Sequence, residues 1–468
     1  MLLSFRVENH KSLREEQQLL LTPVYEDSRP RDADWEAVTV AGIFGANASG
    51  KSNLLDALAL MRETVRWSMR DNEPGGGIPR QPFAFEAPAA EEPSTFVVDL
   101  ALDGVRHTYG FAMDDERVTE EWLYTYPKKR KRVVFEREGD DFSFGEHTPA
   151  KLRQVEAITA ENTLFLTVAA RTANDEVEPV YRWFSQGLAL ASESRRDRPS
   201  WLGRGEAGER ELDSLSRLLR AAGTGVVGVE LVEDEAGRGP AAGVRPRSMA
   251  DRRRETRDSA GTPAAQALVH STFGSGKSRV LSQLLSEVME AGGSDTLVFH
   301  HVEAGDYRPL RWEEESSGTR TLATLGFEAQ RAVEGGGVLV VDEIDASLHP
   351  YLSATLISLF RDEKHNPKGA QLVFTSHDAA LLGNVLGEEV LRRDHVWFVE
   401  KDDRARTSLY PLSDFKPRSD ENRTRRYLVG RYGAVPDLDD ELFRDALRLR
   451  TETPGAGAGA EPKEGSLR

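Results

Sequence analysis

The chain has 468 residues, with 61 Lys and Arg against 78 Asp and Glu, and its formal net charge is −17. Such an acidic balance argues against a protein that coats nucleic acid over its whole surface, although a local basic groove remains compatible with it. Cysteine is absent, which excludes disulfide bonds and thiolate zinc sites and suits a reducing cytosol. Nothing approaches the ~20 apolar residues of a membrane span, so we expect a cytoplasmic protein without membrane contact.

The first informative segment is a buried strand followed by a Gly-rich turn and an amphipathic helix. Ala37–Phe44 is apolar and rich in β-branched residues, and Asn53–Met69 repeats apolar side chains at helical spacing. The turn between them, GANASGKS from Gly45 to Ser52, fits GxxxxGK[ST] at every fixed position. Its glycines let successive backbone N–H groups face phosphate oxygens, and the helix N-terminus adds partial positive charge. The pattern predicts a phosphate-binding loop.

This P-loop gives its polar residues distinct roles. Lys51 would hold the β- and γ-phosphates of ATP, and Ser52 would ligate Mg²⁺. The remaining nucleotide-binding positions of the motif are Gly45, Asn47, Gly50 and Asn53. A second GSGKS, ending at Ser278, has no convincing buried strand before it. We interpret that copy as a turn that opens a helix.

The middle of the chain changes character twice. An Asp103-Gly104 hairpin signal between two alternating runs predicts antiparallel strands, and leucines from Leu212 to Leu219 then share one helix face. Ser192–Glu209 and Glu235–Ala264 are rich in Gly and charged residues and are expected to be surface loops or disordered segments. The predicted units are residues 1–75 (N-terminal ATPase half), 76–150 (antiparallel β lobe), 151–294 (mainly helical insertion), 295–405 (C-terminal ATPase half), 406–450 (C-terminal extension) and 451–468 (disordered tail).

A second apolar strand, Val338–Val341, ends in the acids Asp342 and Glu343. Asp342 would bind Mg²⁺, and Glu343 would orient the attacking water. Lys51 and Asp342 are 291 residues apart, far more than one strand–helix–strand unit needs. One sheet must therefore be completed by two distant segments, which predicts an α/β P-loop NTPase head with an insertion between its halves.

Two polar segments flank these acids. Ser316, Ser317, Gly318 and Thr319 form a second N–H-rich helix start, before a helix expected near Thr321. Because Gly45–Ser52 already hold this subunit's phosphates, the second cradle most simply serves another subunit's nucleotide; an ordinary helix cap is the alternative. His377, at the end of strand Gln371–Ser376, could donate a hydrogen bond to a γ-phosphate. A capping or core histidine is the alternative there.

Taken in order, these motifs resemble those of a known family. FRVENHKSL, GANASGKSN, ESSGT, VVDEIDASLHP and FTSHD look like the ATPase heads of the SMC, RecF and OLD group. The subgroup they resemble most is that of short ATPases without coiled coils, classed with the AAA family but ABC-like in motif order. These occur in phage-defence and abortive-infection loci, often beside RloB or another TOPRIM nuclease. The resemblance covers roughly residues 1–145 and 295–436, and Thr319 stands where transporters have Gln.

The resemblance implies an ABC-type head that binds ATP and Mg²⁺, hydrolyses ATP slowly and dimerises, so that Lys51 of one subunit faces Ser316–Thr319 of the other. It also implies that Glu343 and His377 are catalytic and that Asp345 belongs to the D-loop. The implied role is a sensor or motor subunit of an anti-phage system whose partner is an effector nuclease. A RecF- or SMC-type repair ATPase that binds DNA directly is the open alternative. Gln81 is a weak Q-loop candidate.

Other function classes fit less well. A GTPase would need the Asn of NKxD, which Glu400-Lys401-Asp402-Asp403 lacks. A nuclease within the chain could use His300, His301, Glu303 and Asp306 as a metal cluster, but we interpret them as polar residues at a strand end, and no TOPRIM or HNH pattern is found. The basic runs Lys128–Arg132 and Arg245–Arg257 could contact nucleic-acid phosphates or be solvated loops.

Overall fold

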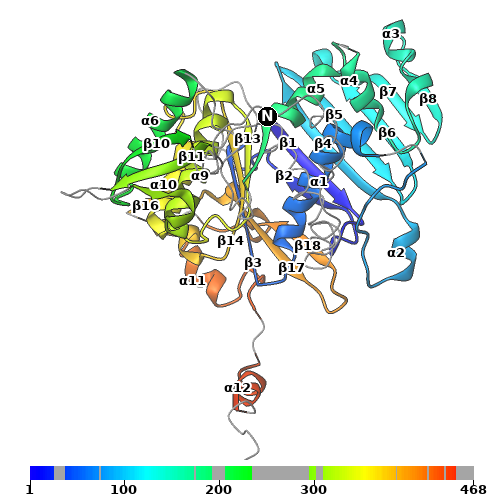
Figure 1. Ribbon diagram of the computed structural model, residues 1–468. Coiled ribbons are helices and arrows are strands. Elements are labelled where there is room, and N and C mark those ends of the chain that lie inside the picture. Colours follow the sequence, from blue (N-terminus) through cyan, green and yellow to red (C-terminus); the bar gives the residue numbers. More distant parts are fainter. Residues whose placement is uncertain are drawn as a thin grey trace, which may run out of the picture.

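The computed structural model describes most of the chain, in ten stretches. These are residues 1–25, 37–72, 75–172, 175–191, 206–233, 295–301, 309–385, 387–418, 421–436 and 439–448. Two large sheets dominate, with a long helix between them (Figure 1). The second GSGKS, the loops expected around residues 235–264, the basic run 245–257, Glu303 with Asp306, and the tail 451–468 lie outside the described residues.

A six-stranded, mostly parallel sheet forms the centre of the fold. Its strand order is β18-β17-β3-β14-β13-β9, and only the β17–β18 pair is antiparallel. The strands are β3 (Val40–Gly45), β9 (Leu188–Ala191), β13 (Val338–Val341), β14 (Gln371–Ser376), β17 (Val396–Lys401) and β18 (Thr407–Pro411). Segments from both ends of the chain therefore meet in one sheet. The predicted α/β head built from two distant segments is confirmed.

The antiparallel lobe is a seven-stranded sheet of order β2-β1-β4-β5-β6-β7-β8. The Asp103-Gly104 turn joins β4 to β5, as predicted, and all nine residues of β5 pair with β4. The strands are β1 (Leu2–Glu8), β2 (Gln17–Leu20), β4 (Ser94–Leu102), β5 (Val105–Met113), β6 (Val118–Thr125), β7 (Arg132–Glu138) and β8 (Asp141–Phe144). A short helix, α2 (Ala87–Glu91), precedes β4.

Strand β3 shows how the two layers are held together. Its side chains alternate, as they must in a strand: Ala41 and Ile43 join the core shared with helix α1 (Lys51–Asp71) and the antiparallel lobe. Val40 and Phe44 point to the other core, with residues of α9 (Ser317–Gly335) and α10 (Pro350–Arg361). Because both faces are covered, the strand is apolar throughout, as parallel strands usually are.

The stretch predicted as a helical insertion contributes helices and two strands. Its helices are α3 (Ala150–Arg153), α4 (Phe165–Arg171), α5 (Glu178–Arg182) and α6 (Glu206–Ala221). The predicted leucine face is present in α6, where Leu215 and Leu219 are buried. However, β9 joins the central sheet, and α6 starts at Glu206, inside a stretch expected to be loop. The division of the chain into units thus stays a prediction.

A small third sheet connects this stretch to the C-terminal half. It consists of β10 (Val226–Glu233), β11 (Asp295–His301) and β12 (Leu310–Arg311). Strand β11, expected as the start of the C-terminal ATPase half, pairs with β10 and β12 and not with the central sheet. Its Phe299 packs against Trp312. The sheet thereby places β11 beside the start of α9.

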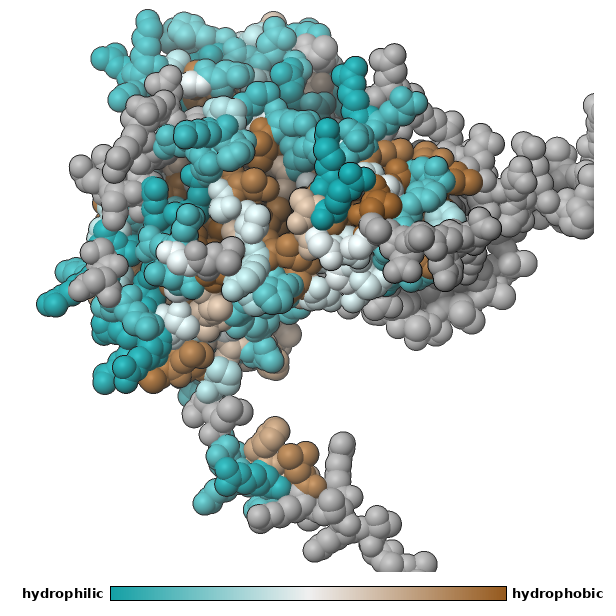
Figure 2. Space-filling view, turned by 90° about the vertical axis from the view of Figure 1, so that its left-hand side faces the viewer, coloured by the Kyte–Doolittle hydropathy of each residue, from teal (hydrophilic) through white to brown (hydrophobic). Residues whose placement is uncertain are grey.

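The C-terminal part surrounds the edge of the central sheet. Strands β15 (Asn384–Val385) and β16 (Glu388–Glu389) form a hairpin, and α11 (Arg423–Leu428) follows. The last described helix, α12 (Asp440–Arg448), lies apart from the body and exposes Leu442, Phe443 and Leu447 (Figure 2). Among the described helices, none is long and apolar enough to cross a membrane.

Candidate functional site

The order of the central strands brings the predicted site residues together. Strands β3, β14 and β13 are parallel neighbours, so their carboxyl ends lie at one edge of the sheet. That edge carries the P-loop after β3, His377 after β14, and Asp342 with Glu343 after β13. Ligands of open α/β sheets bind at this kind of edge. Lys51 and Asp342 are 291 residues apart in the sequence. In the sheet, the strands that precede them are separated by a single strand, β14.

The P-loop needs its glycines for space as well as for conformation. Gly50 has a φ of 106°, and a Cβ on it would lie 2.3 Å from the Thr407 side-chain oxygen. A Cβ on Gly45 would lie 2.4 Å from the Val399 carbonyl oxygen. Ala48 adopts a φ of 62°, a left-handed conformation uncommon outside glycine. The loop is therefore fixed in a tight curl at the N-terminus of α1.

Lys51 folds back over this loop. Its ammonium group donates hydrogen bonds to the carbonyl oxygens of Gly45 and Ala46, both at 2.9 Å. Burial lowers the pKa of Lys51, and the carboxylates of Glu343 and Asp342 oppose that shift. The ammonium group of Lys51 thus lies close to the acidic residues. A bound phosphate would form charged hydrogen bonds with it, which are stronger than its present bonds to carbonyl oxygens.

The acids are held by a hydroxyl that the sequence did not single out. The buried Thr375 side chain donates to Asp342 Oδ1 at 2.6 Å and accepts from the Glu343 backbone N–H at 2.7 Å. The Ser52 hydroxyl lies 3.1 Å from the same Asp342 oxygen. A hydroxyl and a carboxylate oxygen so close together are the ligand types that Mg²⁺ prefers. The donor set fits the predicted metal role of Ser52 and Asp342.

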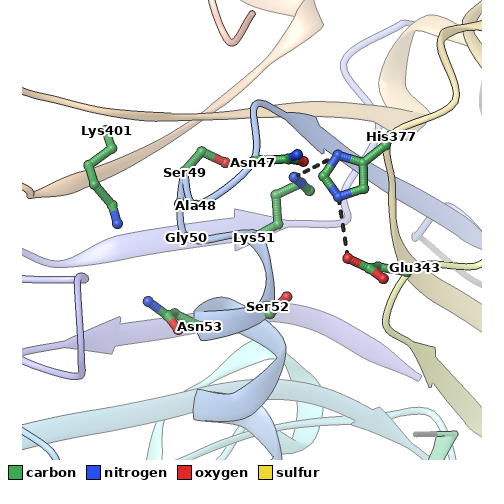
Figure 3. A pocket seen from close by; sticks show the side chains of 10 residues that line it. All are labelled: Asn47, Ala48, Ser49, Gly50, Lys51, Ser52, Asn53, Glu343, His377 and Lys401. Carbon is green, nitrogen blue, oxygen red and sulfur yellow. Dashed lines mark hydrogen bonds and ion pairs between the residues drawn. The ribbon is translucent and has the colours of Figure 1, made fainter. Parts of the chain in front are cut away.

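His377 connects the two halves of the site (Figure 3). Its Nδ1 lies 3.4 Å from the Lys51 ammonium, and its Nε2 lies 3.3 Å from Glu343 Oε1. An ammonium group can only donate a hydrogen bond, so Nδ1 of His377 is the acceptor. Nε2 therefore carries the ring proton and donates a hydrogen bond to Glu343. The His377 backbone N–H lies 3.3 Å from Asp345 Oδ1, which places the predicted D-loop acid at the same edge.

These groups surround a cavity of about 490 Å³, a size typical of small-molecule sites. It is lined by Asn47, Ala48, Ser49, Gly50, Lys51, Ser52, Asn53, Glu343, His377 and Lys401. Among the described residues, the buried hydroxyl of Ser49 has no hydrogen-bond partner. An unpaired polar atom inside a phosphate loop is what a site for phosphate oxygens should contain. Lys401 belongs to the segment that was compared with a GTPase motif in the sequence analysis, and it places a positive charge in the wall of the cavity.

A second group of residues missed by sequence reasoning supports the P-loop from behind. The buried Thr407 hydroxyl bonds to Ser12 Oγ at 2.7 Å and to the Ser49 carbonyl at 2.8 Å. Asn53 donates to Ser12 Oγ at 2.6 Å. The N-terminal loop and β18 thus brace the loop jointly. Ser12 stands in the FRVENHKSL segment, so the resemblance could have suggested it, whereas no local pattern indicates Thr407.

The predicted second cradle, Ser316–Thr319, which corresponds to the signature loop of ABC-type heads, lies outside this cavity. Ser316 caps α9 by accepting a hydrogen bond from the Thr319 backbone N–H at 3.1 Å, and α9 begins at Ser317, earlier than the expected Thr321. A Cβ on Gly318 would lie 2.9 Å from the Ser347 carbonyl oxygen, so the loop rests against the D-loop. Ser316–Thr319 do not line the cavity of their own chain. The weak Q-loop candidate Gln81 is exposed and does not line it either.

The residue before the signature is anchored from the third sheet. Glu315 is buried and lies 2.5 Å from Nε2 of His301, at the end of β11. His300 lies instead beside Glu230, at 3.0 Å. Among the described residues, no group of three or more His, Asp and Glu could hold a metal ion. Because Glu303 and Asp306 lie outside the described residues, the interpretation of the suggested nuclease cluster as strand-end polar residues stays a prediction.

Comparison with known proteins agrees with this geometry. A family model described as "AAA domain, putative AbiEii toxin, Type IV TA system" matches residues 40–383. The chain belongs to this family. The comparison with curated proteins found no match. The matched range of this AAA-domain protein includes the P-loop, the signature segment, both acids and His377.

Solved SMC head domains are also similar to the AAA-domain protein. One, from Thermotoga maritima, is 13% identical with a TM-score of 0.35, over 88% of this chain and 98% of that chain. Another, from Pyrococcus furiosus and bound to the C-terminal domain of ScpA, is 11% identical with a TM-score of 0.35, over 89% of this chain and 97% of that chain. The central sheet with its P-loop, and the order of the motifs along the chain, are those of an ABC-class ATPase head.

Proposed function

We propose that this AAA-domain protein binds ATP with Mg²⁺ and hydrolyses it slowly. The observation that carries the proposal is the convergence of the P-loop, Glu343 and His377 around one cavity, with Asp342 bonded to the Ser52 hydroxyl of that loop. Lys51 and the loop N–H groups hold the phosphates. Ser52 and Asp342 would hold Mg²⁺, which neutralises phosphate charge when bound.

The attacking water is oriented by this chain's own groups. Glu343 is the acceptor for the water proton, and its backbone is fixed by the Thr375 hydroxyl. His377 already bonds to Glu343 and lies beside Lys51. A γ-phosphate held by Lys51 would therefore lie close to His377, which in turn contacts the catalytic acid Glu343. Positioning and charge stabilisation account for most catalysis of phosphoryl transfer. Slow turnover follows if the last stabilising groups come from a second subunit.

We further propose that two copies share each nucleotide. Ser316–Thr319 form an N–H-rich helix start that is excluded from the cavity of their own chain, and such a start suits phosphate. In an ATP-bound dimer it would complete the partner subunit's site. The family description names a toxin and a toxin–antitoxin system, which supports a further proposal: in anti-phage defence the ATP state controls an effector partner, a nuclease.

The nucleotide proposal is tested by calorimetry with ATP and Mg²⁺. Lys51→Ala should abolish binding, because it removes the main cation of the site while the backbone cradle remains. Lys364→Ala, at an exposed lysine that does not line the cavity, is the matched control and should bind as wild type. Wild-type affinity in Lys51→Ala would contradict the assignment, and GTP competing as well as ATP would favour a GTPase.

The partner proposal needs a separate experiment. Affinity-tagged wild type and Lys51→Ala are purified from the native host, and each eluate is incubated with plasmid DNA and tRNA in Mg²⁺ or Mn²⁺. We expect cleavage only from eluates that contain a second protein, with an ATP dependence that Lys51→Ala lacks. Cleavage by the repurified chain alone would contradict the proposal. Direct, ATP-dependent DNA binding without a partner would favour the repair-ATPase alternative.

A further inference from the structure

The β6–β7 turn, at one end of the antiparallel lobe, is strongly basic in a protein of net charge −17. It carries five consecutive cations from Lys128 to Arg132, and the short helix η2 (Pro127–Lys129) forms its tip. Lys128, Lys129 and Arg130 are exposed. Within the described part of the chain, no ion pair neutralises these three side chains, whereas Arg132 pairs with Glu176 at 2.8 Å.

The backbone of this turn gives an independent indication of function. Lys128 and Lys129 have φ angles of 56° and 62°, a left-handed conformation in which glycine or asparagine is favoured and lysine is strained. A turn optimised only for stability would carry Asn-Gly at such positions. Strained residues cluster at binding sites and active sites, so such a pair points to a functional role for the turn. Here the side chains that are kept at a conformational cost are two exposed cations.

Aromatic side chains accompany the charges. Trp122, Tyr124 and Tyr126 alternate along β6 and its extension, so they share one face of the sheet. The Lys131 ammonium lies 3.4 Å from the centroid of the Tyr124 ring, and the Arg106 guanidinium lies 5.3 Å from that of Tyr126. Cations ordered on aromatic rings beside exposed lysines are the mixture found where proteins follow a nucleic-acid backbone.

The position of the turn separates it from the nucleotide site. Strand β1 runs towards the loop that carries Ser12, which bonds to Asn53 behind the P-loop. Because β1, β4, β5 and β6 alternate in direction, β6 ends at the opposite end of the lobe (cyan in Figure 1). A ligand at the turn therefore leaves the ATP cavity free. Beside its cations, the exposed tip of the turn carries only Pro127 as an apolar residue, and so little apolar surface disfavours insertion into a membrane.

We propose that the β6–β7 turn binds the phosphate backbone of a nucleic acid, with Lys128, Lys129 and Arg130 as the contacting cations. This site is separate from the proposed ATPase function and does not depend on it. Binding is sequence-independent, because phosphate contacts carry no base information. It is also salt-dependent, because each neutralised phosphate releases counterions.

The test is fluorescence anisotropy with labelled 30-mers of duplex DNA, single-stranded DNA and RNA, at about 50 and about 200 mM salt. The decisive variant, Lys128→Gly/Lys129→Gly, removes two charges and relaxes both strained positions, so its melting temperature should match or exceed that of wild type. Two phosphate contacts add about −1.8 to the salt slope on duplex DNA, so wild type should lose roughly tenfold more affinity between these salts than the variant. Lys51→Ala should bind as wild type does.

Two controls make the outcome unambiguous. Lys364→Ala/Lys368→Ala removes the same charge from exposed positions of the C-terminal half and should leave binding unchanged. If the glycine variant fails to fold, Lys128→Gln/Lys129→Gln removes the charges but keeps unbranched polar side chains, and it should show the same loss. Wild-type affinity and salt slope in either folded variant would overturn the proposal. Absence of binding by wild type at 50 mM salt, or binding only to vesicles of anionic lipid, would overturn it as well.

Discussion

Replacing Thr375 with valine should separate ATP hydrolysis from ATP binding. The side chain is fully buried, and its hydroxyl joins Asp342 and the backbone of Glu343. Valine has nearly the same volume, so no cavity forms. A hydrogen bond to a charged group contributes roughly 1.5–3 kcal/mol and a neutral one about 1 kcal/mol. We therefore expect the free energy of unfolding to fall by about 2.5–4 kcal/mol.

The effect on catalysis follows from the two acids that lose their fixed orientation. Displacements near 1 Å at a reacting centre cost on the order of 100-fold in rate, so the turnover number should fall by about 10- to 100-fold. The dissociation constant for ATP should change less than about threefold, because Lys51 and the P-loop are untouched. Coupled phosphate-release kinetics, calorimetry and urea unfolding measure the three quantities.

Thr355→Val is the matched control, because the hydroxyl of Thr355 is exposed and bonds only to a helix carbonyl. Its free energy of unfolding and the activation free energy of its turnover should each stay within about 0.5 kcal/mol of the wild-type values. If Thr375→Val were as active and as stable as this control, the hydroxyl would not position the acids, and the account of Asp342 and Glu343 would be wrong.

Three further changes probe other parts of the molecule. Gly50→Ala should weaken ATP binding at least tenfold in calorimetry, because its Cβ meets the Thr407 oxygen at 2.3 Å, whereas Gly75→Ala has nothing within 4 Å of its Cβ and should bind normally. His301→Ala, which removes the bond to Glu315, should lower steady-state ATPase activity about tenfold and leave ATP affinity unchanged. Wild-type activity in this variant would show that β11 does not position Ser316–Thr319. Burial, and then the charge of Arg361, hold the pKa of His395 well below its usual value. Below about pH 6.5 this histidine is therefore protonated in the unfolded chain but not in the folded protein. The free energy of unfolding should fall as the pH drops, by at most about 1.4 kcal/mol per pH unit. Urea unfolding at pH 7.5 and 5.5 should show a smaller decrease for His395→Gln than for wild type.

The motif residues could be predicted because their chemistry is local. A P-loop needs its glycines, its lysine and its serine within eight residues, and an acid pair at a strand end is visible in the sequence alone. Thr375 was within a predicted strand but carried no signal of its own. Its importance arises because β14 lies between β3 and β13, an order that the sequence does not state. Thr407 was missed for the same reason.

Strand β9 shows a different limit. Its sequence, Leu-Ala-Leu-Ala from Leu188 to Ala191, consists of good helix formers and is too short for periodicity to decide. Parallel pairing with β13 along all four residues overrides that preference. The start of α6 was missed because the charged residues around Glu206 resemble those of a loop, whereas the apolar face appears only from Leu212 onward.

Light scattering of Glu343→Gln with and without ATP and Mg²⁺ tests the shared-site account most directly. The variant keeps the phosphate contacts but lacks the acid that polarises water, so ATP should remain bound and the protein should shift from monomer to dimer at micromolar concentration. Adding Ser316→Arg to the same chain should abolish the shift by filling the second cradle. A Glu343→Gln protein that binds ATP and stays monomeric would contradict the account.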